Sequence, residues 1–387
     1  MRSAKTLAVA ATAVAGVTAA GLLAASAIAA PAQQAHPANP TSPFPSYSIR
    51  TVLNGAGLSH DNSHTGKKEG LTKPDDLTQF GGDLFTAFQN GVGPQGEAST
   101  SGNSDSTIVE FRPGGSVVSQ WDVRGKVDGL TANPATGEVI ATVNEDLHSS
   151  LYSIEPGGAL IHYSYSKPLP HNGGTDAISF FNGKMLVSAS APGTTGAAAP
   201  NAKYPAVYSV TLDQTTHLAT ARPYYYDEAS ARLANVHLGQ HIKLALTDPD
   251  SSAIVPSLAR RFGGDFVLNS QGDQELIFSS VPSSLWVLKV PQSVDDIAWA
   301  TAWHATLFAT DNGADKVVAV DSRLFWPGTA FVAVTPCNAN SAPATCPAPP
   351  AFPANYLGLL DVLTGKIIPV KLRGGTLHPQ GLVFMNN

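Results

Sequence analysis

The sequence of 387 residues is poor in charged side chains and in cysteine. Charged residues make up only 13% of the chain, and the formal net charge is −6. Long solvent-exposed helices need far more charge than this, so the composition argues against a largely helical protein. The acidic balance also argues against a nucleic acid or an anionic membrane surface as the partner.

Long apolar runs are absent outside the first 30 residues. The leading run follows Arg2 and Lys5. It ends in the small-x-small pattern of Ala27 and Ala29, which signal peptidase recognises. A retained membrane anchor is the alternative, because the run is long enough to span a bilayer. We predict a signal peptide over residues 1–30 and a secreted, soluble monomer without a membrane span.

The chain has only two cysteines, Cys337 and Cys346, and both lie in the stretch TPCNANSAPATCPAPP. A metal-binding pair is not favoured, since there is no Cys-x-x-Cys spacing and no neighbouring histidine. Two cysteines this close together in an exported protein are typical of a disulfide bond. We therefore predict a disulfide between them.

Glycine and proline are abundant, with 35 and 29 residues. The proline-rich residues 31–46 predict an extended linker. From residue 47 onward the chain consists of short apolar runs separated by Gly, Pro or Asn at intervals of about eight to twelve residues. This pattern predicts a single all-β domain over residues 47–387.

The apolar runs repeat along the chain. IVEFRPGGSVV at residues 108–118 and LYSIEPGGALI at residues 151–161 share a hairpin with a Pro-Gly-Gly turn. Further units consist of a polar residue, a short strand, a Gly turn and a second strand. These units begin at Asp75, Asp128, Asp176, Pro256, Asp295 and Gln380. A repeat of about 40–50 residues is typical of a β-propeller, whose four-stranded antiparallel blades pack around an axis.

Six units predict a propeller of six blades, with seven as the alternative. Two spacings between units are too long for one blade and predict insertions near residues 191–255 and 325–355. The last unit has only its first strand. We therefore expect the amino-terminal stretch YSIRTVLNG to complete that blade and close the ring.

Two stretches resemble known propeller repeats. LFATDNGADKVVAVD at residues 307–321 resembles the NHL and YVTN-type repeat. STIVEFRPGGSVVSQWDV at residues 106–123 is similar to the repeat of virginiamycin B lyase-like propellers. The wider resemblance, to the gluconolactonase and senescence-marker family, covers most of residues 71–387 and implies a metal held near the axis by residues of different blades. Such propellers include lactonases, lyases and binding scaffolds, so the fold alone does not imply a function.

Polar residues at the strand ends predict a site on one face. In a propeller, the loops that enter the first strands and those that leave the second strands lie on the same face. The predicted ligands of calcium or magnesium come from the entering loops: Asp75, Asp128, Asp176 and Asp295. The predicted ligand-binding residues are Asn90, Glu97, Asn144, Glu145, Asp311, Asn312 and Gln380. In the alternative interpretation, such aspartates only fix turns by accepting backbone N–H bonds.

Two histidines, His171 and His378, are expected on the same face. Histidine is suited to general acid or base catalysis because it titrates near neutral pH, while solvent-exposed loop histidines are the alternative. We predict a protein that binds a small molecule, a glycan or a peptide, with a divalent cation as the candidate cofactor. The alternative is a metal-dependent hydrolase or lyase, of lactonase or esterase type, acting on a small extracellular substrate.

Thiol titration of the non-reduced, denatured protein should find no free thiol, because we expect Cys337 and Cys346 to be bridged. The bond would close a short loop, so its reduction should lower the free energy of unfolding by about 2–3 kcal/mol and leave the β-fold intact. Two titratable thiols per chain would contradict the prediction.

Overall fold

The computed structural model describes residues 46–170, 173–190, 204–335 and 355–386. These residues form β-strands and one 3-10 turn, η1 (Gly55–Gly57), without an α-helix, so the predicted all-β class is confirmed. Among them, no helix is present that has the length and apolar character needed to cross a membrane. The predicted signal peptide, the two cysteines and His171 lie outside the described residues.

Most strands pair into antiparallel sheets of four, which we call blades A to F in the chain order of their first strands. Blade A contains β4 (Pro74–Phe80), β5 (Asp83–Phe88), β6 (Asp105–Phe111) and β7 (Val117–Arg124). Blade B contains β8 (Val127–Ala132), β9 (Val139–Val143), β10 (Ser150–Ile154) and β11 (Leu160–Tyr165). Blade C contains β12 (Ile178–Phe181), β13 (Lys184–Ser188), β14 (Pro205–Asp213) and β15 (Leu218–Tyr226).

The other three blades complete the set formed by the described residues. Blade D contains β18 (Pro249–Ile254), β19 (Phe266–Ser270), β20 (Glu275–Val281) and β21 (Ser284–Lys289). Blade E contains β22 (Val294–Trp299), β25 (Ala330–Val334), β26 (Tyr356–Leu360) and β27 (Ile367–Pro369). Blade F contains β29 (Pro379–Asn386), β23 (Ala305–Asp311), β24 (Lys316–Ser322) and β1 (Tyr47–Asn54).

The remaining strands are short and lie at the margins of the blades. They are β2 (Ser59–Asp61), β3 (Lys68–Gly70), β16 (Ser230–Leu233), β17 (His241–Lys243) and β28 (Leu372–Arg373). The β16–β17 pair extends blade D, because β16 runs parallel to β21. A parallel pairing of β11 with β15 joins blades B and C at their outer edges.

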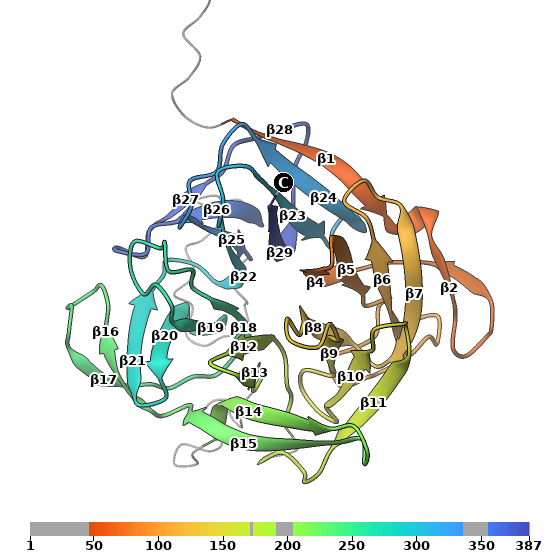
Figure 1. Ribbon diagram of the computed structural model, residues 1–387, viewed down its shortest axis with the longest axis horizontal. Helices are drawn as coiled ribbons and strands as arrows, with labels where there is room; N and C mark the ends of the chain where they lie inside the picture. The colour runs from red at the N-terminus through yellow and green to blue at the C-terminus, as the bar shows by residue number, and fades with distance from the viewer. Residues whose placement is uncertain (1–45, 171–172, 191–203, 336–354, 387) are drawn as a thin grey trace, which may run out of the picture. The chain divides into compact units, whose positions relative to one another are not determined.

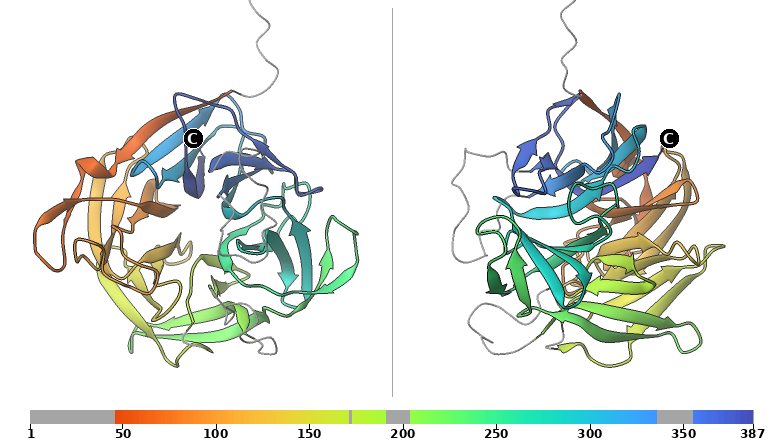
Figure 2. Two further views of the ribbon diagram at one scale, coloured as in Figure 1. Left: turned by 180° about the vertical axis from the view of Figure 1, so that it is seen from behind. Right: turned by 60° about the vertical axis from the view of Figure 1, so that its left-hand side comes forward.

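The blades stand around a common axis with their first strands innermost (Figure 1). Each first strand contacts the first strand of the next blade, and β29 contacts β4, so the ring is closed. Figure 2 shows the same ring from behind and from one side. The fold is a β-propeller, as the repeats predict.

The hydrophobic core lies between the blades and not on the axis. Each pair of neighbouring blades encloses its own apolar cluster; between blades A and B, for example, Phe85 and Ile108 pack with Leu130 and Val139. Similar clusters fill the other five junctions. Because both faces of a blade are covered in this way, the middle strands are apolar on both sides, and the axis is left free for polar groups.

The two ends of the chain meet in blade F, as expected from YSIRTVLNG. β1 pairs with β24 along the outer edge of the blade, and β29 pairs with β23 along the inner edge. The first and last strands of the domain are therefore held in one sheet. The predicted closure of the ring is confirmed.

Blades E and F are interlocked in a way that the sequence did not predict. The stretch that begins at Asp295 was interpreted as one hairpin unit, but β22 belongs to blade E and the following strand, β23, belongs to blade F. The reason lies in the connection: the N–H of Ala300 donates to Thr329 and its carbonyl accepts from Gly328, so β22 continues along β25 and does not turn back. The chain then returns from blade F to complete blade E.

The fourth blade also begins earlier than predicted. The sequence analysis placed its start at Pro256, whereas β18 begins at Pro249. Stretch 256–265 is instead a loop between the first two strands of blade D. This earlier start of β18 determines which residues of blade D lie next to the propeller axis.

Neighbouring first strands run parallel and approach one another closely. The Asp76 carboxylate of β4 accepts from the N–H of Leu130 in β8, and two residues further on Thr78 accepts from Ala132. At Gly129 the approach leaves no room for a side chain, because an added Cβ would lie 2.3 Å from the carbonyl oxygen of Asp176 in the next blade.

Gly129→Ala should lower the free energy of unfolding by about 1–3 kcal/mol, because the methyl group forces blades B and C apart. Gly57→Ala is the matched control, since an added Cβ there meets nothing within 4 Å. Chemical denaturation of both variants measures the difference. Equal stabilities would show that the close approach at Gly129 is not a constraint.

Candidate functional site: an acidic cavity on the propeller axis

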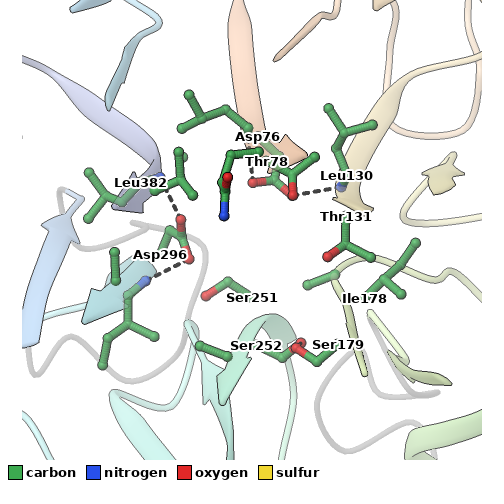
Figure 3. Close-up of a pocket in the computed structure, with 18 of the residues that line it drawn as sticks. Asp76, Thr78, Leu130, Thr131, Ile178, Ser179, Ser251, Ser252, Asp296 and Leu382 are labelled. Atoms are coloured by element: carbon green, nitrogen blue, oxygen red, sulfur yellow. Dashed lines mark hydrogen bonds between the residues drawn. The ribbon is translucent and has the colours of Figure 1, made fainter. Parts of the chain in front are cut away.

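A cavity of about 930 Å³ runs along the propeller axis. It is lined by residues of all six first strands, together with a few side chains from the ends of neighbouring strands. Figure 3 shows part of its wall, where Asp76 and Asp296 are bonded to the backbone of the adjacent blades. The site therefore belongs to the whole ring and not to one blade.

An acidic residue occupies the same position at the start of five first strands. The six equivalent residues are Asp75, Asp128, Asp176, Asp250, Asp295 and, in blade F, Gln380, and all six line the cavity. The four predicted metal ligands and Gln380 are thus brought together as expected. Asp250 was missed because the fourth unit was started at Pro256; the signal that identifies it is the stretch Pro-Asp-Ser-Ser, which matches Pro-Asp-Asp-Leu in blade A.

A β-bulge at this position explains why the aspartates reach the axis. In β4 the ladder with β5 skips from Pro74 to Leu77, and the same shift occurs at the starts of β8, β18, β22 and β29. A bulge releases residues from the regular alternation and redirects their side chains. The repeated bulge therefore accompanies the cavity-lining aspartate or glutamine in five blades, whereas the β12 ladder of blade C has no such shift.

Lys126 is the only lysine, arginine or histidine among the cavity-lining residues. Its Nζ atom lies 2.6 Å from Oδ1 of Asp128 and also contacts the Glu145 carboxylate. Burial alone would lower the pKa of Lys126, but the carboxylates of Asp128, Glu145 and Asp75 raise it well above its ordinary value. Lys126 is therefore a fixed positive charge on one side of an acidic cavity.

Amide side chains of neighbouring blades hold two of the aspartates in place. Gln89 of blade A donates to Oδ1 of Asp128 at 3.0 Å, and Gln271 of blade D donates to Oδ1 of Asp295 at 2.7 Å. These bonds orient the carboxylates without neutralising them. Asp76 and Asp296 differ from the others, because each accepts two backbone N–H bonds and so serves to join blades.

The opposite side of the cavity holds the carboxyl groups of Asp176, Asp250 and Asp295, and no described basic side chain lines it. Asp176 and Asp250 interact directly through their carboxyl groups. Burial and the charges of nearby acids raise the pKa of Asp176 and that of Asp250 well above the ordinary value. Burial and the neighbouring Asp296 and Asp176 raise the pKa of Asp295 to about 8.

Several buried polar atoms around the cavity have no hydrogen-bond partner within the described residues. They include Oδ2 of Asp128, Oδ2 of Asp250, Oγ of Ser251 and Oε1 of Gln380. Asp128 is only 4% exposed, so its free oxygen is not satisfied by bulk water. Such atoms are available to a bound ligand.

The predicted residues of the leaving loops are only partly brought to the cavity. Glu145 lines it, but Asn90, Glu97, Asn144 and Asn312 do not. Asn90 and Asn144 have left-handed backbones, and their side chains bond to Thr72 and Lys126 N–H groups. Glu97 accepts from the N–H of Gln95, and Asn312 donates to the carbonyl of Pro74. These contacts fix loops.

His378, predicted as a general acid or base, and Asp311, predicted to bind the ligand, are not among the cavity-lining residues. Nδ1 of His378 is 3.6 Å from Oδ1 of the buried Asp311, and the histidine side chain is 50% exposed. His171, the other candidate acid or base, lies outside the described residues. Across the described ranges, no three His, Cys, Asp or Glu side chains form a group that holds a metal ion as they stand.

Comparison with known proteins adds information on the fold. No protein-family profile and no curated protein sequence matches the chain. Among solved structures, a streptogramin B lyase is 10% identical with a TM-score of 0.42, covering 87% of this chain and 91% of that one. Virginiamycin B lyase from Staphylococcus aureus is 10% identical with a TM-score of 0.42, covering 88% and 96%. A protein of unknown function from Bacteroides caccae is 12% identical with a TM-score of 0.43, covering 89% and 100%. Virginiamycin B lyase, whose repeat the sequence analysis compared with residues 106–123, is thus among the solved structures to which the chain is similar.

The stability of the protein should fall as the pH rises from about 5 to 9 in buffer without divalent cations. Aspartates with a raised pKa in the folded state bind more protons there than in the unfolded chain, where the value is about 3.9. Their stabilising contribution is complete below about pH 4 and is lost as the pH passes the folded values, about 6 for Asp296 and about 8 for Asp295.

Asp295→Asn should flatten this pH dependence and raise the free energy of unfolding at pH 9 by about 1–3 kcal/mol, because the amide stays neutral and can still accept from Gln271. The exposed Asp321→Asn is the control. Denaturant unfolding at several pH values measures both variants, and an unchanged slope in Asp295→Asn would contradict the prediction.

Proposed function

We propose that this protein binds a positively charged ligand at the acidic end of its axial cavity. The observation that carries the proposal is the imbalance of charge: five equivalent aspartates and Glu145 face the cavity, and among the described residues Lys126 is the only basic side chain that lines it. Lys126 contacts Asp128 and Glu145, which leaves the carboxyl groups of the opposite wall uncompensated.

A bound cation would relieve two unfavourable contributions at once. Carboxylates close to one another raise each other's pKa and resist ionisation, and burial adds a desolvation cost. A cation next to Asp176, Asp250 and Asp295 would offset both and would also bond to oxygen atoms that lack a partner, such as Oδ2 of Asp250. It would stabilise the folded state, since it binds the assembled ring and not the unfolded chain.

The sequence predicts a small molecule, a glycan or a peptide as the ligand, with calcium or magnesium as the candidate cofactor. We narrow this prediction to a divalent cation or a small organic cation. We also propose that the protein acts after export, as the leader of residues 1–30 predicts, and that nucleic acid is not its partner, because an acidic cavity repels phosphate groups. The alternative, a metal-dependent hydrolase or lyase, depends on histidines, and His378 is not a cavity-lining residue.

Binding can be detected as a rise in melting temperature. We expect at least one of calcium chloride, magnesium chloride and methylammonium chloride, at millimolar concentration, to raise it more than sodium chloride of equal ionic strength does. The variant Asp176→Asn with Asp250→Asn should lose this cation-induced shift. Because the two substitutions also change the baseline melting temperature, the cation-induced shift is the quantity to compare.

The exposed Asp321→Asn serves as the matched control and should keep the full shift, because Asp321 only pairs with Arg50 on the surface. If none of the three cations raises the melting temperature beyond the sodium control, the proposal is wrong. The aspartates would then be turn-fixing residues.

A further inference from the structure

We propose that the ligand of the axial cavity is an organic ammonium ion with an apolar body, and that this body lies along the apolar end of the same cavity. The inference rests on the proposed function, since it names the chemical class of the cation. It is carried by three features of the cavity: a lysine that already places an ammonium group among the carboxylates, an apolar end, and a volume far larger than an ion needs.

Lys126 shows that a primary ammonium group fits between these carboxyl groups. Its Nζ atom lies 2.6 Å from Asp128 and contacts Glu145 on one wall. The other wall presents Asp176, Asp250 and Asp295, the same type of group at equivalent positions of the ring, with no lysine or arginine of its own among the lining residues. A second ammonium group, supplied by a ligand, would pair with the carboxyl groups of this wall as Lys126 pairs with those of the other.

The site also offers buried oxygen atoms that a ligand can satisfy. Oδ2 of Asp128 and Oδ2 of Asp250 have no partner, and the side chain of Asp128 is 4% exposed. An ammonium group has three N–H donors, so it can bond to several such acceptors at once. The site is therefore more than a cluster of acidic residues, because its buried carboxylate oxygens without a partner indicate a ligand that donates hydrogen bonds.

The opposite end of the cavity, which we call the apolar end, contributes large apolar side chains next to the polar Gln79, Thr301 and Asn386. The first strands run parallel, so their ends lie together, and four or five residues beyond the aspartates the lining side chains are Phe80, Phe180, Ile254, Trp299 and Phe384. At about 3.3 Å per residue, this end lies roughly 13–17 Å from the acidic end. Phe80 and Ile254 are each 38% exposed, so apolar surface remains uncovered there. An extended ligand can reach both ends.

The volume of the axial cavity is large enough for a small organic molecule and exceeds what a single ion needs. The cavity measures about 930 Å³. Pockets of about 300–1,000 Å³ are typical of sites for small organic molecules, which bury most of their surface against apolar walls and are oriented by a few polar groups. An ammonium head at the aspartates and an apolar body along Ile178 and Ile254 match this division of the cavity.

The test compares two amines that differ only in the apolar body. Isothermal titration calorimetry of the purified protein with methylammonium chloride and n-octylammonium chloride, below the concentration at which the latter forms micelles, gives both affinities. A fully buried methylene strengthens binding about fourfold. We expect n-octylammonium to bind at least tenfold more tightly than methylammonium, and Asp176→Asn with Asp250→Asn to weaken both at least tenfold.

Two variants test the apolar end. Ile254→Asn and Phe80→Ser should each reduce the preference for n-octylammonium severalfold and leave the affinity for methylammonium unchanged. Ile368→Asn is the matched control, because Ile368 is a similarly exposed strand isoleucine, 49% exposed, that does not line the cavity. It should keep the full preference.

The possible outcomes separate this inference from the proposed function. If n-octylammonium binds no more tightly than methylammonium, if its preference survives in both apolar-end variants, or if only calcium or magnesium binds, the inference is wrong while cation binding stands. If no cation binds at all, both are wrong. Retained binding of both amines in Asp176→Asn with Asp250→Asn would also overturn the inference, because the head group would then lie elsewhere.

Discussion

Repulsion among carboxyl groups that meet on the propeller axis is the constraint on which the rest of the site depends. Every blade contributes the same strand start to the same ring, so an aspartate that recurs in blades A to E becomes five aspartates around one cavity. The bulge after Pro74 and its counterparts in four other blades redirect the side chains at this position. A protein that repeats such a unit must therefore compensate a concentrated negative charge.

The structure compensates this charge unevenly. On one wall, Lys126 and the amide of Gln89 stabilise Asp128. On the other wall, Asp176 and Asp250 raise each other's pKa, and Asp295 receives one amide bond from Gln271. Carboxyl groups with a raised pKa lose their protons as the pH rises, and their mutual repulsion then grows. The compensation by described residues is therefore stronger around Asp128 than around Asp176, Asp250 and Asp295.

The rest of the fold keeps the carboxyl groups in place against this repulsion. Apolar clusters fill every junction between neighbouring blades, and Asp296 of β22 accepts from Leu382 of β29. Blades E and F are additionally interlocked, since the chain leaves blade E after β22 and returns to it at β25. Because opening the ring there would break several strand ladders together, the acidic residues cannot relax by moving apart.

The sequence by itself determined the all-β propeller, the closure of the ring by YSIRTVLNG, and the convergence of Asp75, Asp128, Asp176 and Asp295. Periodic strands and repeated strand starts are local patterns, and ring closure converts equal positions in a repeat into neighbours in space. Only the tertiary structure revealed Asp250, Lys126 and the interlocked blades. The start of blade D carries a local signal, Pro-Asp-Ser-Ser, which only the structure singled out. The charge pairing across the cavity and the partner of β22 are set by contacts between residues far apart in the chain, and no local pattern encodes them.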